Sequence, residues 1–255
     1  MPMTTITAIK KRKGFDREFW IATESEGFFR FAPERDEATR IVDHSLCLSF
    51  DLQYKNIQDI EEEEEGHLLL ATWGQGVVKL FYDQQQQDFT ESFTFSTENG
   101  MSNNFIRDLL TDKEGNYWFA TYGGGLSCLT DESMIFYDLD QIGFQDNKAR
   151  SVLHDGKDLW IGLENGLIRA DPFCFTDFEF YDPAMGLPQD AVTGLYRDPD
   201  STLWAATENH GLYYKKNKEA NFQPWFYTRT QPGKKINDLS GQQHLLYLAT
   251  VGGYY

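Results

Sequence analysis

The sequence predicts an all-β protein, a β-propeller of about six four-stranded blade units of which the last is incomplete. One observation is a motif rich in Trp, Tyr, Phe and Thr and closed by Gly, which recurs six times in steps of 42 to 49 residues. A second is that short apolar runs alternate with polar, glycine-containing turns along all 255 residues. A repeat of this length with strand-like content is typical of a propeller with one four-stranded blade per repeat.

Each repeat opens with a short apolar segment, which we interpret as the innermost strand of a blade. These segments begin at Ile6, Ile57, Ile106, Ala149, Val192 and Ile236. A polar turn follows, and then the recurring motif, whose aromatic and β-branched residues favour a half-buried strand. Its second position is occupied by Trp20, Leu69, Trp118, Trp160, Trp204 and Tyr247. We expect these side chains to pack between neighbouring blades, since burying a large side chain contributes roughly 1.5–3 kcal/mol.

A glycine-rich bend, a third strand and an aromatic fourth strand complete the repeat. The fourth strands are expected to begin at Leu46, Ser92, Met134, Phe178 and Gln223. The chain then forms a single propeller domain, with repeats at roughly 4–50, 55–100, 104–145, 148–190, 191–232 and 235–255. Because the last repeat stops inside its third strand, we expect this chain to be part of a longer propeller, with open apolar faces on its first and last blades.

Charge and composition exclude several classes of function. The net charge of −17, from 40 acidic and 23 basic residues, disfavours binding to nucleic acid, whose phosphates carry the same sign. No apolar run approaches the ~18 residues of a membrane-spanning helix, and the first residues do not read as a secretory signal. The three cysteines and five histidines show no ligand spacing, so no metal and no cofactor is expected.

Four segments carry a family resemblance. The two closest copies of the repeat are NFIRDLLTDKEGNYWFATYGGGLSCL from Asn104 and the segment from Ala149 to Arg169, and the two lead-ins are GMSNNFIRDL from Gly100 and GLPQDAVTGL from Gly186. They resemble the two-component regulator propeller repeat, in which a stretch similar to NxVxxLxxDxxGxLWIGTxxGGLxR recurs. Leu69 and Leu163 depart from it, where the repeat has Trp and Thr. The resemblance implies a sensor propeller of a hybrid two-component system, whose other domains include a histidine kinase. A fragment of such a sensor would be periplasmic; otherwise the chain would be cytoplasmic.

The position after the first apolar residue of each inner strand is polar and differs between repeats. It is occupied by Thr7, Gln58, Arg107, Arg150, Thr193 and Asn237. Because the first strand of a blade lines the central channel of a propeller, these side chains should converge on one volume. We expect a ligand to contact Gln58, Arg107, Arg150 and Asn237, with the two arginines clamping a carboxylate or an array of sugar hydroxyls. Alternatively, these side chains bond backbone carbonyls and channel water.

The bends between second and third strands should form a rim on one face of the ring. They carry Trp73, Tyr122, Glu164, Glu208 and His210, a mixture that suits a small polar ligand such as an oligosaccharide. We therefore predict a non-catalytic sensing or binding module whose partners are such a ligand and other domains of a sensor kinase.

Two alternatives remain open. The first is a polysaccharide hydrolase or lyase that uses Glu164 with Glu208, or Glu208 with His210. The second is a protein-interaction scaffold that uses the acidic rim.

The turn at Asp112 resembles the Asp-box of sialidase-type propellers, which would suggest a metal or a sugar. We expect instead that Asp112 bonds backbone amides and that Gly115 adopts a positive φ.

Overall fold

The computed structural model describes residues 5–15, 17–31, 56–63, 66–83, 85, 88–130, 133–140, 144, 147–172, 178–225, 235–242, 245–251 and 253–254. This part of the chain contains no α-helix, and its regular structure outside the strands includes the short 3-10 helices η2 (Thr97–Asn99) and η3 (Pro183–Met185). Within it, no helix has the length and hydropathy that crossing a bilayer requires.

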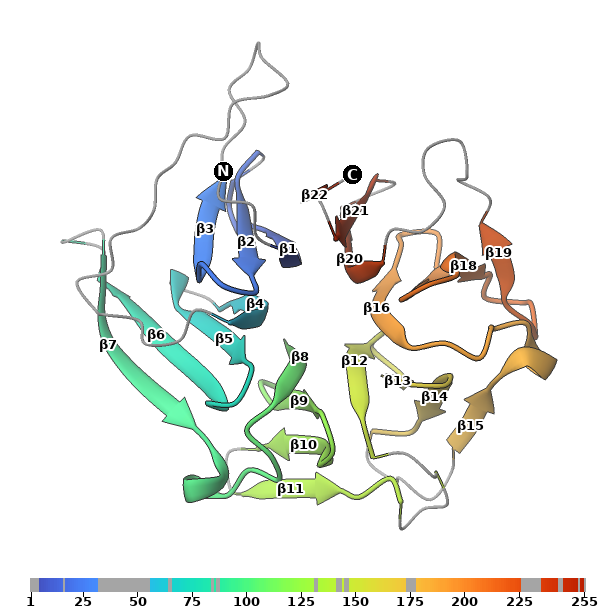
Figure 1. Cartoon of the computed structure of the whole chain (residues 1–255), viewed down its shortest axis with the longest axis horizontal. Coiled ribbons are helices and arrows are strands. Elements are labelled where there is room, and N and C mark those ends of the chain that lie inside the picture. The colour runs from blue at the N-terminus through green and yellow to red at the C-terminus, as the bar shows by residue number, and fades with distance from the viewer. Residues whose placement is uncertain are drawn as a thin grey trace.

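The strands form six antiparallel sheets, each made of strands that are consecutive in the chain, and Figure 1 shows the sheets placed around a common axis. The inner strands are β1 (Ile6–Lys11), β4 (Ile57–Glu62), β8 (Ile106–Thr111), β12 (Ala149–His154), β16 (Val192–Arg197) and β20 (Ile236–Gln242). The second strands are β2 (Phe19–Thr23), β5 (Leu68–Thr72), β9 (Tyr117–Thr121), β13 (Leu159–Leu163), β17 (Leu203–Thr207) and β21 (Leu245–Thr250). The inner strands begin where the sequence predicts them.

Outer strands complete the sheets. The third strands are β3 (Phe28–Phe31), β6 (Val77–Asp83), β10 (Gly125–Leu129), β14 (Leu167–Ala170), β18 (Gly211–Lys215) and β22 (Gly253–Tyr254). The fourth strands are β7 (Asp88–Phe95), β11 (Met134–Tyr137), β15 (Phe178–Tyr181) and β19 (Gln223–Trp225). The expected fourth strand of the first repeat, from Leu46, lies outside the described residues.

An all-β propeller with four-stranded antiparallel blades is therefore confirmed, whereas the count of about six such blades is wrong. Four of the sheets have four described strands, and the sheets β1–β3 and β20–β22 have three each. The sequence count treated every recurrence of the motif as a four-stranded blade, whereas the described strands of the first and last sheets number three each.

The hydrophobic core lies between neighbouring sheets rather than inside any one of them. Trp118 packs with Val152 and Ile161 of the following sheet, and Trp20 packs with Ile60 and Leu70. Trp118 and Trp20 are each only 3% exposed, which confirms them as packing residues. Burial on both faces of each sheet explains why the strands carry apolar residues in nearly every position.

One of these apolar clusters joins the first sheet to the last. Ile9 and Phe19 pack with Ala249 and Tyr247, and the rings of Phe19 and Tyr247 lie 5.1 Å apart. Among the described strands the apolar faces of the first and last sheets thus cover each other, and the open faces expected from the sequence are not observed. Covering them removes apolar surface from water, which favours this closed arrangement.

An aspartate in the turn before the second strand fixes the tryptophan of three sheets. The indole Nε1 of Trp118 donates to Asp112 at 2.8 Å, and that of Trp160 donates to Asp155 at 2.9 Å. Asp112 also accepts backbone amides of its turn, and Gly115 has a φ of 88°. Burial alone would raise the pKa of Asp112, but the bonds from Trp118 and Asn116 hold it below its usual range. The turn interpretation of Asp112 is confirmed.

A threonine at the end of the second strand fixes the following bend. In β5, the Oγ1 of Thr72 donates to the carbonyl of Gly76 at 2.7 Å, and β2, β9 and β17 repeat this bond. Gly76 has a φ of 82°, and a Cβ there would lie 1.9 Å from the carbonyl oxygen of Phe95. The bend thus requires glycine, and it holds the rim residue that directly follows the threonine, such as Trp73.

Candidate ligand-binding cavity

A β-bulge interrupts every inner strand at the same place. The register shifts between Ile6 and Ala8 in β1 and between Ile106 and Asp108 in β8, and β4, β12, β16 and β20 show the equivalent shift. A bulge inserts one extra residue that has no ladder partner and turns its side chain in a new direction. The extra residues are the variable polar ones, Thr7, Gln58, Arg107, Arg150, Thr193 and Asn237.

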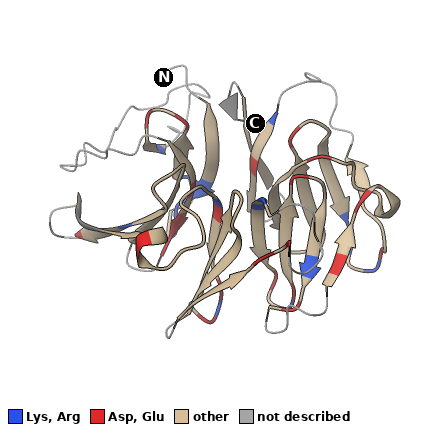
Figure 2. Ribbon diagram, turned by 60° about the horizontal axis from the view of Figure 1, so that its bottom comes forward, with Lys and Arg blue, Asp and Glu red and all other residues tan. Residues whose placement is uncertain are grey.

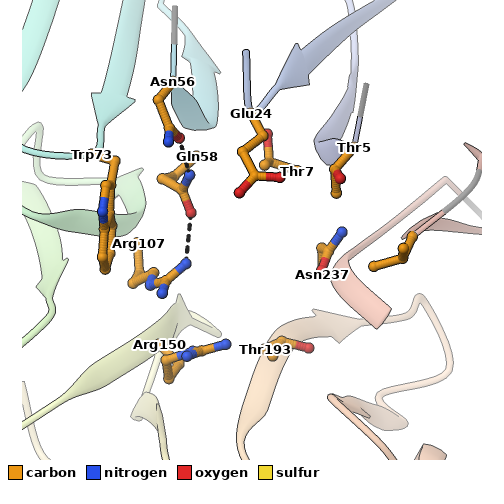
Figure 3. A pocket seen from close by; sticks show the side chains of 11 residues that line it. Thr5, Thr7, Glu24, Asn56, Gln58, Trp73, Arg107, Arg150, Thr193 and Asn237 are labelled. Atoms are coloured by element: carbon orange, nitrogen blue, oxygen red, sulfur yellow. Dashed lines mark hydrogen bonds between the residues drawn. The ribbon is translucent and has the colours of Figure 1, made fainter. Parts of the chain in front are cut away.

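All six bulged residues line one cavity of about 330 Å³ on the propeller axis. Figure 3 shows their side chains arriving from different strands around a shared space. The remaining lining residues are Thr5, Glu24, Asn56, Trp73 and Val251. Of the predicted ligand-binding residues, the structure therefore brings Gln58, Arg107, Arg150, Asn237 and Trp73 to the cavity.

The two arginines have different surroundings. Arg150 Nη1 lies 2.8 Å from Glu164 Oε1, and its Nη2 lies 3.9 Å from Glu208 Oε1. Arg107 donates to Gln58 Oε1 at 2.7 Å, and no described carboxylate forms an ion pair with it. Burial and the nearby charge of Arg150 lower the pKa of Arg107 to about 10. Arg150 thus has ion-pair partners among the described residues, whereas Arg107 has none.

Aromatic rings hold Arg107 in place. Its guanidinium carbon lies 4.0 Å from the centre of the Trp73 ring and 5.2 Å from that of Tyr122. The two rings are 5.3 Å apart, and Phe105 packs edge-on against Trp73 at 4.9 Å. One face of Trp73 is therefore covered by a cation, which is an attractive contact in itself. Trp73 acts first as a support for Arg107, a role that differs from the sugar platform suggested by its rim position.

The other bulged residues favour the alternative of bonds to backbone carbonyls. Asn237 Nδ2 donates to the carbonyl of Ile6 at 2.7 Å, and Thr193 Oγ1 donates to that of Ile236 at 2.9 Å. Thr7 makes the equivalent bond to Ile57. These three residues each tie one sheet to a neighbouring sheet, so the set divides into three short linking residues, two arginines, and Gln58, which bonds Arg107.

The predicted rim residues Tyr122, Glu164, Glu208 and His210 do not line the cavity itself. Tyr122, Glu164 and Glu208 contact the two arginines, and Glu208 also pairs with Lys235 at 3.0 Å. His210 Nδ1 instead lies 2.9 Å from Asp190 Oδ2. The proposed acid/base partner of Glu208 is thus bound to another carboxylate.

One group among the described residues has the geometry for a metal ion. The ligand atoms of Asp112, Glu114 and His154 all lie within 4.8 Å of one another. Asp112 already accepts hydrogen bonds from Trp118 and Asn116, as described above, so its carboxylate serves the turn. The group lies apart from the cavity.

Sequence reasoning missed Thr5 and Asn56. Each stands directly before an inner strand, two residues before a bulged residue, Thr7 and Gln58 respectively. This constant offset from the bulged residue is the signal that could have identified both.

A second feature that the sequence did not reveal is a buried charged layer next to the cavity. Lys10 Nζ lies 3.1 Å from Asp59 Oδ1, and Asp59 is 2% exposed. Asp59 also accepts the amide of Leu109, and Asp108 accepts the amide of Val152 at 2.7 Å, each from the next sheet. Burial raises the pKa of Asp108, and burial likewise raises that of Asp238 to about 6. This layer links blades.

Comparisons with known proteins agree with the architecture. The profile of the two component regulator propeller family matches residues 100–123 and 186–209. The structure is similar to the extracellular domains of the hybrid two component systems BT3049 and BT4673 from B. thetaiotaomicron. For BT3049 the identity is 16%, the TM-score 0.71, and the match covers 100% of this chain and 39% of that domain. For BT4673 the values are 17%, 0.64, 99% and 38%.

Virginiamycin B lyase from Staphylococcus aureus is also similar, with 13% identity, a TM-score of 0.67, and coverage of 98% of this chain and 78% of the lyase. At these identities the structural matches show the fold alone, and the chain spans about two fifths of the two extracellular domains. No curated protein sequence matches the chain. The predicted resemblance is confirmed in two segments of the chain, which match the two component regulator propeller repeat.

Proposed function

We propose that this propeller is a non-catalytic binding module that holds a small polar ligand, such as an oligosaccharide, in the cavity on its axis. The observation that carries the proposal is the alignment of six β-bulges, which turns one polar side chain from every sheet into a single volume of about 330 Å³. That volume falls at the lower end of the range typical of small-molecule sites.

The chemistry of the lining supports a polar ligand. Apart from Trp73 and Val251, every lining residue carries a hydroxyl, an amide or a charged group. Because several of these groups come from different sheets, a molecule with hydroxyls on opposite sides can bond to both sides at once. Asn56 and Gln58 lie on one side and Thr193 on the other in Figure 3.

We further propose that the module belongs to a longer, sensor-type protein. Two segments match the two component regulator propeller repeat, and two of the structural relatives are extracellular domains that are more than twice as long. In such a protein the propeller would lie in the periplasm, and ligand binding would be transmitted to other domains of the sensor.

Calorimetric titration of a panel of neutral and acidic saccharides tests the binding proposal. A Thr5→Trp variant should block the cavity, because Thr5 lines it and an indole fills far more space than the threonine side chain. Ser133→Trp is the matched control, since Ser133 is exposed in the turn between β10 and β11. We expect wild type and Ser133→Trp to bind the same saccharides and Thr5→Trp to lose them. Equal binding by all three proteins would place the ligand elsewhere and refute the proposal.

A further inference from the structure

The two arginines of the cavity differ in their ion-pair partners, and this difference points to a class of ligand. Arg150 has two glutamates at its guanidinium, but among the described residues Gln58 is the one hydrogen-bond acceptor of Arg107. Arg107 lines the cavity, so a bound ligand can supply a further acceptor to its guanidinium. A guanidinium held among protein groups is costly unless its donors are satisfied, which favours such a ligand.

Resting on the proposed function, we propose that the cavity selects a ligand that carries a single carboxylate, such as a uronic-acid saccharide, and that Arg107 binds the carboxylate. A planar guanidinium matches a carboxylate with two parallel hydrogen bonds. The contacts with Trp73 and Gln58 fix the guanidinium in advance, which lowers the ordering cost of binding. The remaining polar side chains of the cavity would then contact the hydroxyls of the ligand.

The charges around the cavity favour a singly charged anion. The residues that line it include two cations, Arg107 and Arg150, and one carboxylate, Glu24. The lining itself therefore carries one excess positive charge, which one carboxylate balances. A dianionic phosphate would bring an excess negative charge close to the two glutamates that hold Arg150.

The overall charge of −17 does not oppose this inference. Figure 2 shows the acidic residues spread over turns and strands of many parts of the ring. At physiological ionic strength, interactions between exposed charges are screened beyond about 8 Å. A ligand inside the cavity therefore experiences chiefly the groups that line it.

The test titrates two saccharides that differ only in the carboxylate, methyl β-glucuronide and methyl β-glucoside, into the full chain. Benzoate serves as a carboxylate without a sugar. We expect the glucuronide to bind at least tenfold more tightly than the glucoside, since hydrogen bonds to a charged group contribute about 1.5–3 kcal/mol. Arg107→Gln should remove that preference. Arg107→Lys keeps the positive charge but lacks the two parallel N–H donors of a guanidinium, so it should retain part of the preference.

Arg169→Gln is the matched control, because it removes the same charge from an arginine of β14 that pairs with Asp158 at 3.0 Å outside the cavity. It should keep the full preference for the glucuronide. Circular dichroism and the unfolding midpoint establish that each variant is folded.

The outcomes separate this inference from the proposed function. Binding of the glucoside without any preference for the glucuronide, or a preference that persists in Arg107→Gln, would overturn the inference and leave the saccharide proposal standing. Arg107-dependent binding of benzoate without either saccharide would support the carboxylate inference and refute the saccharide proposal. If no probe binds, both are refuted.

Discussion

Replacing Trp118 by Ala tests the packing between blades. The Trp118 side chain is 3% exposed, stacks on Tyr137 with ring centres 5.9 Å apart, and lies in the cluster between the third and fourth sheets. Removing an aromatic side chain from such a site costs about 3–5 kcal/mol, because the cavity is only partly refilled. The change also leaves Asp112 Oδ2 without the indole donor at 2.8 Å, which acts in the same direction. We therefore expect a loss of about 3–5 kcal/mol in the free energy of unfolding.

Urea unfolding followed by far-UV circular dichroism measures this loss, with the slope of the transition checked for equality between proteins. The matched control is Trp225→Ala. Trp225 lies on the outer strand β19 and is 47% exposed, so its loss creates no enclosed cavity and should cost roughly 1–2 kcal/mol. An unchanged midpoint for Trp118→Ala, or a larger loss for Trp225→Ala, would show that the packing described between the sheets is incorrect.

Three further predictions concern buried carboxylates. Lys10→Met should lower the free energy of unfolding by about 3–5 kcal/mol at pH 7, because it leaves Asp59 buried without its cation, and Lys10→Met with Asp59→Asn should recover part of the loss. Burial raises the pKa of Asp238 to about 6, so the folded state binds this proton more tightly than the unfolded state. Protonation of Asp238 should therefore stabilise the folded state increasingly as the pH falls from 7 towards 4. When urea midpoints are measured across that range, the Asp238→Asn variant should lack this part of the pH dependence that wild type shows. Asp155→Ala should cost about 1–3 kcal/mol by removing the acceptor of Trp160 Nε1, whereas a midpoint equal to wild type would contradict its structural role.

Local signals in the sequence were sufficient to predict the inner and second strands, whereas β7 begins at Asp88 rather than at Ser92. Thr72 and Gly76 fix one bend by a side-chain bond and a positive φ, and the same residue types recur at the same spacing in other repeats. Trp118 and Trp160 mark the second strand because each needs both a buried face and a hydrogen-bond acceptor in the preceding turn. Such signals lie within a few residues of one another, so they can be read without knowing the fold.

The arrangement of the site depends on relations between sheets that no local pattern contains. The sequence identified Arg107 and Arg150 as equivalent positions, but it could not show that Glu164 and Glu208 form ion pairs with one of them and not the other. Likewise, Trp73 could be predicted to lie on the rim, yet the guanidinium that covers its ring comes from the next sheet.

The buried partnership of Lys10 with Asp59 was missed for the same reason. Its members stand at different positions of two inner strands, and they meet because those strands run side by side along the axis. Asp59 also reads in the sequence as an ordinary polar residue of an alternating strand.

The central claim is that six β-bulges create one binding cavity, and a crystal structure of the chain soaked with methyl β-glucuronide tests it most directly. We predict density for the sugar on the propeller axis, with its carboxylate within hydrogen-bond distance of Arg107 and its hydroxyls near Gln58 and Thr193. Density only on the outer strands, or an empty axial cavity in crystals whose protein binds the sugar in solution, would contradict the claim.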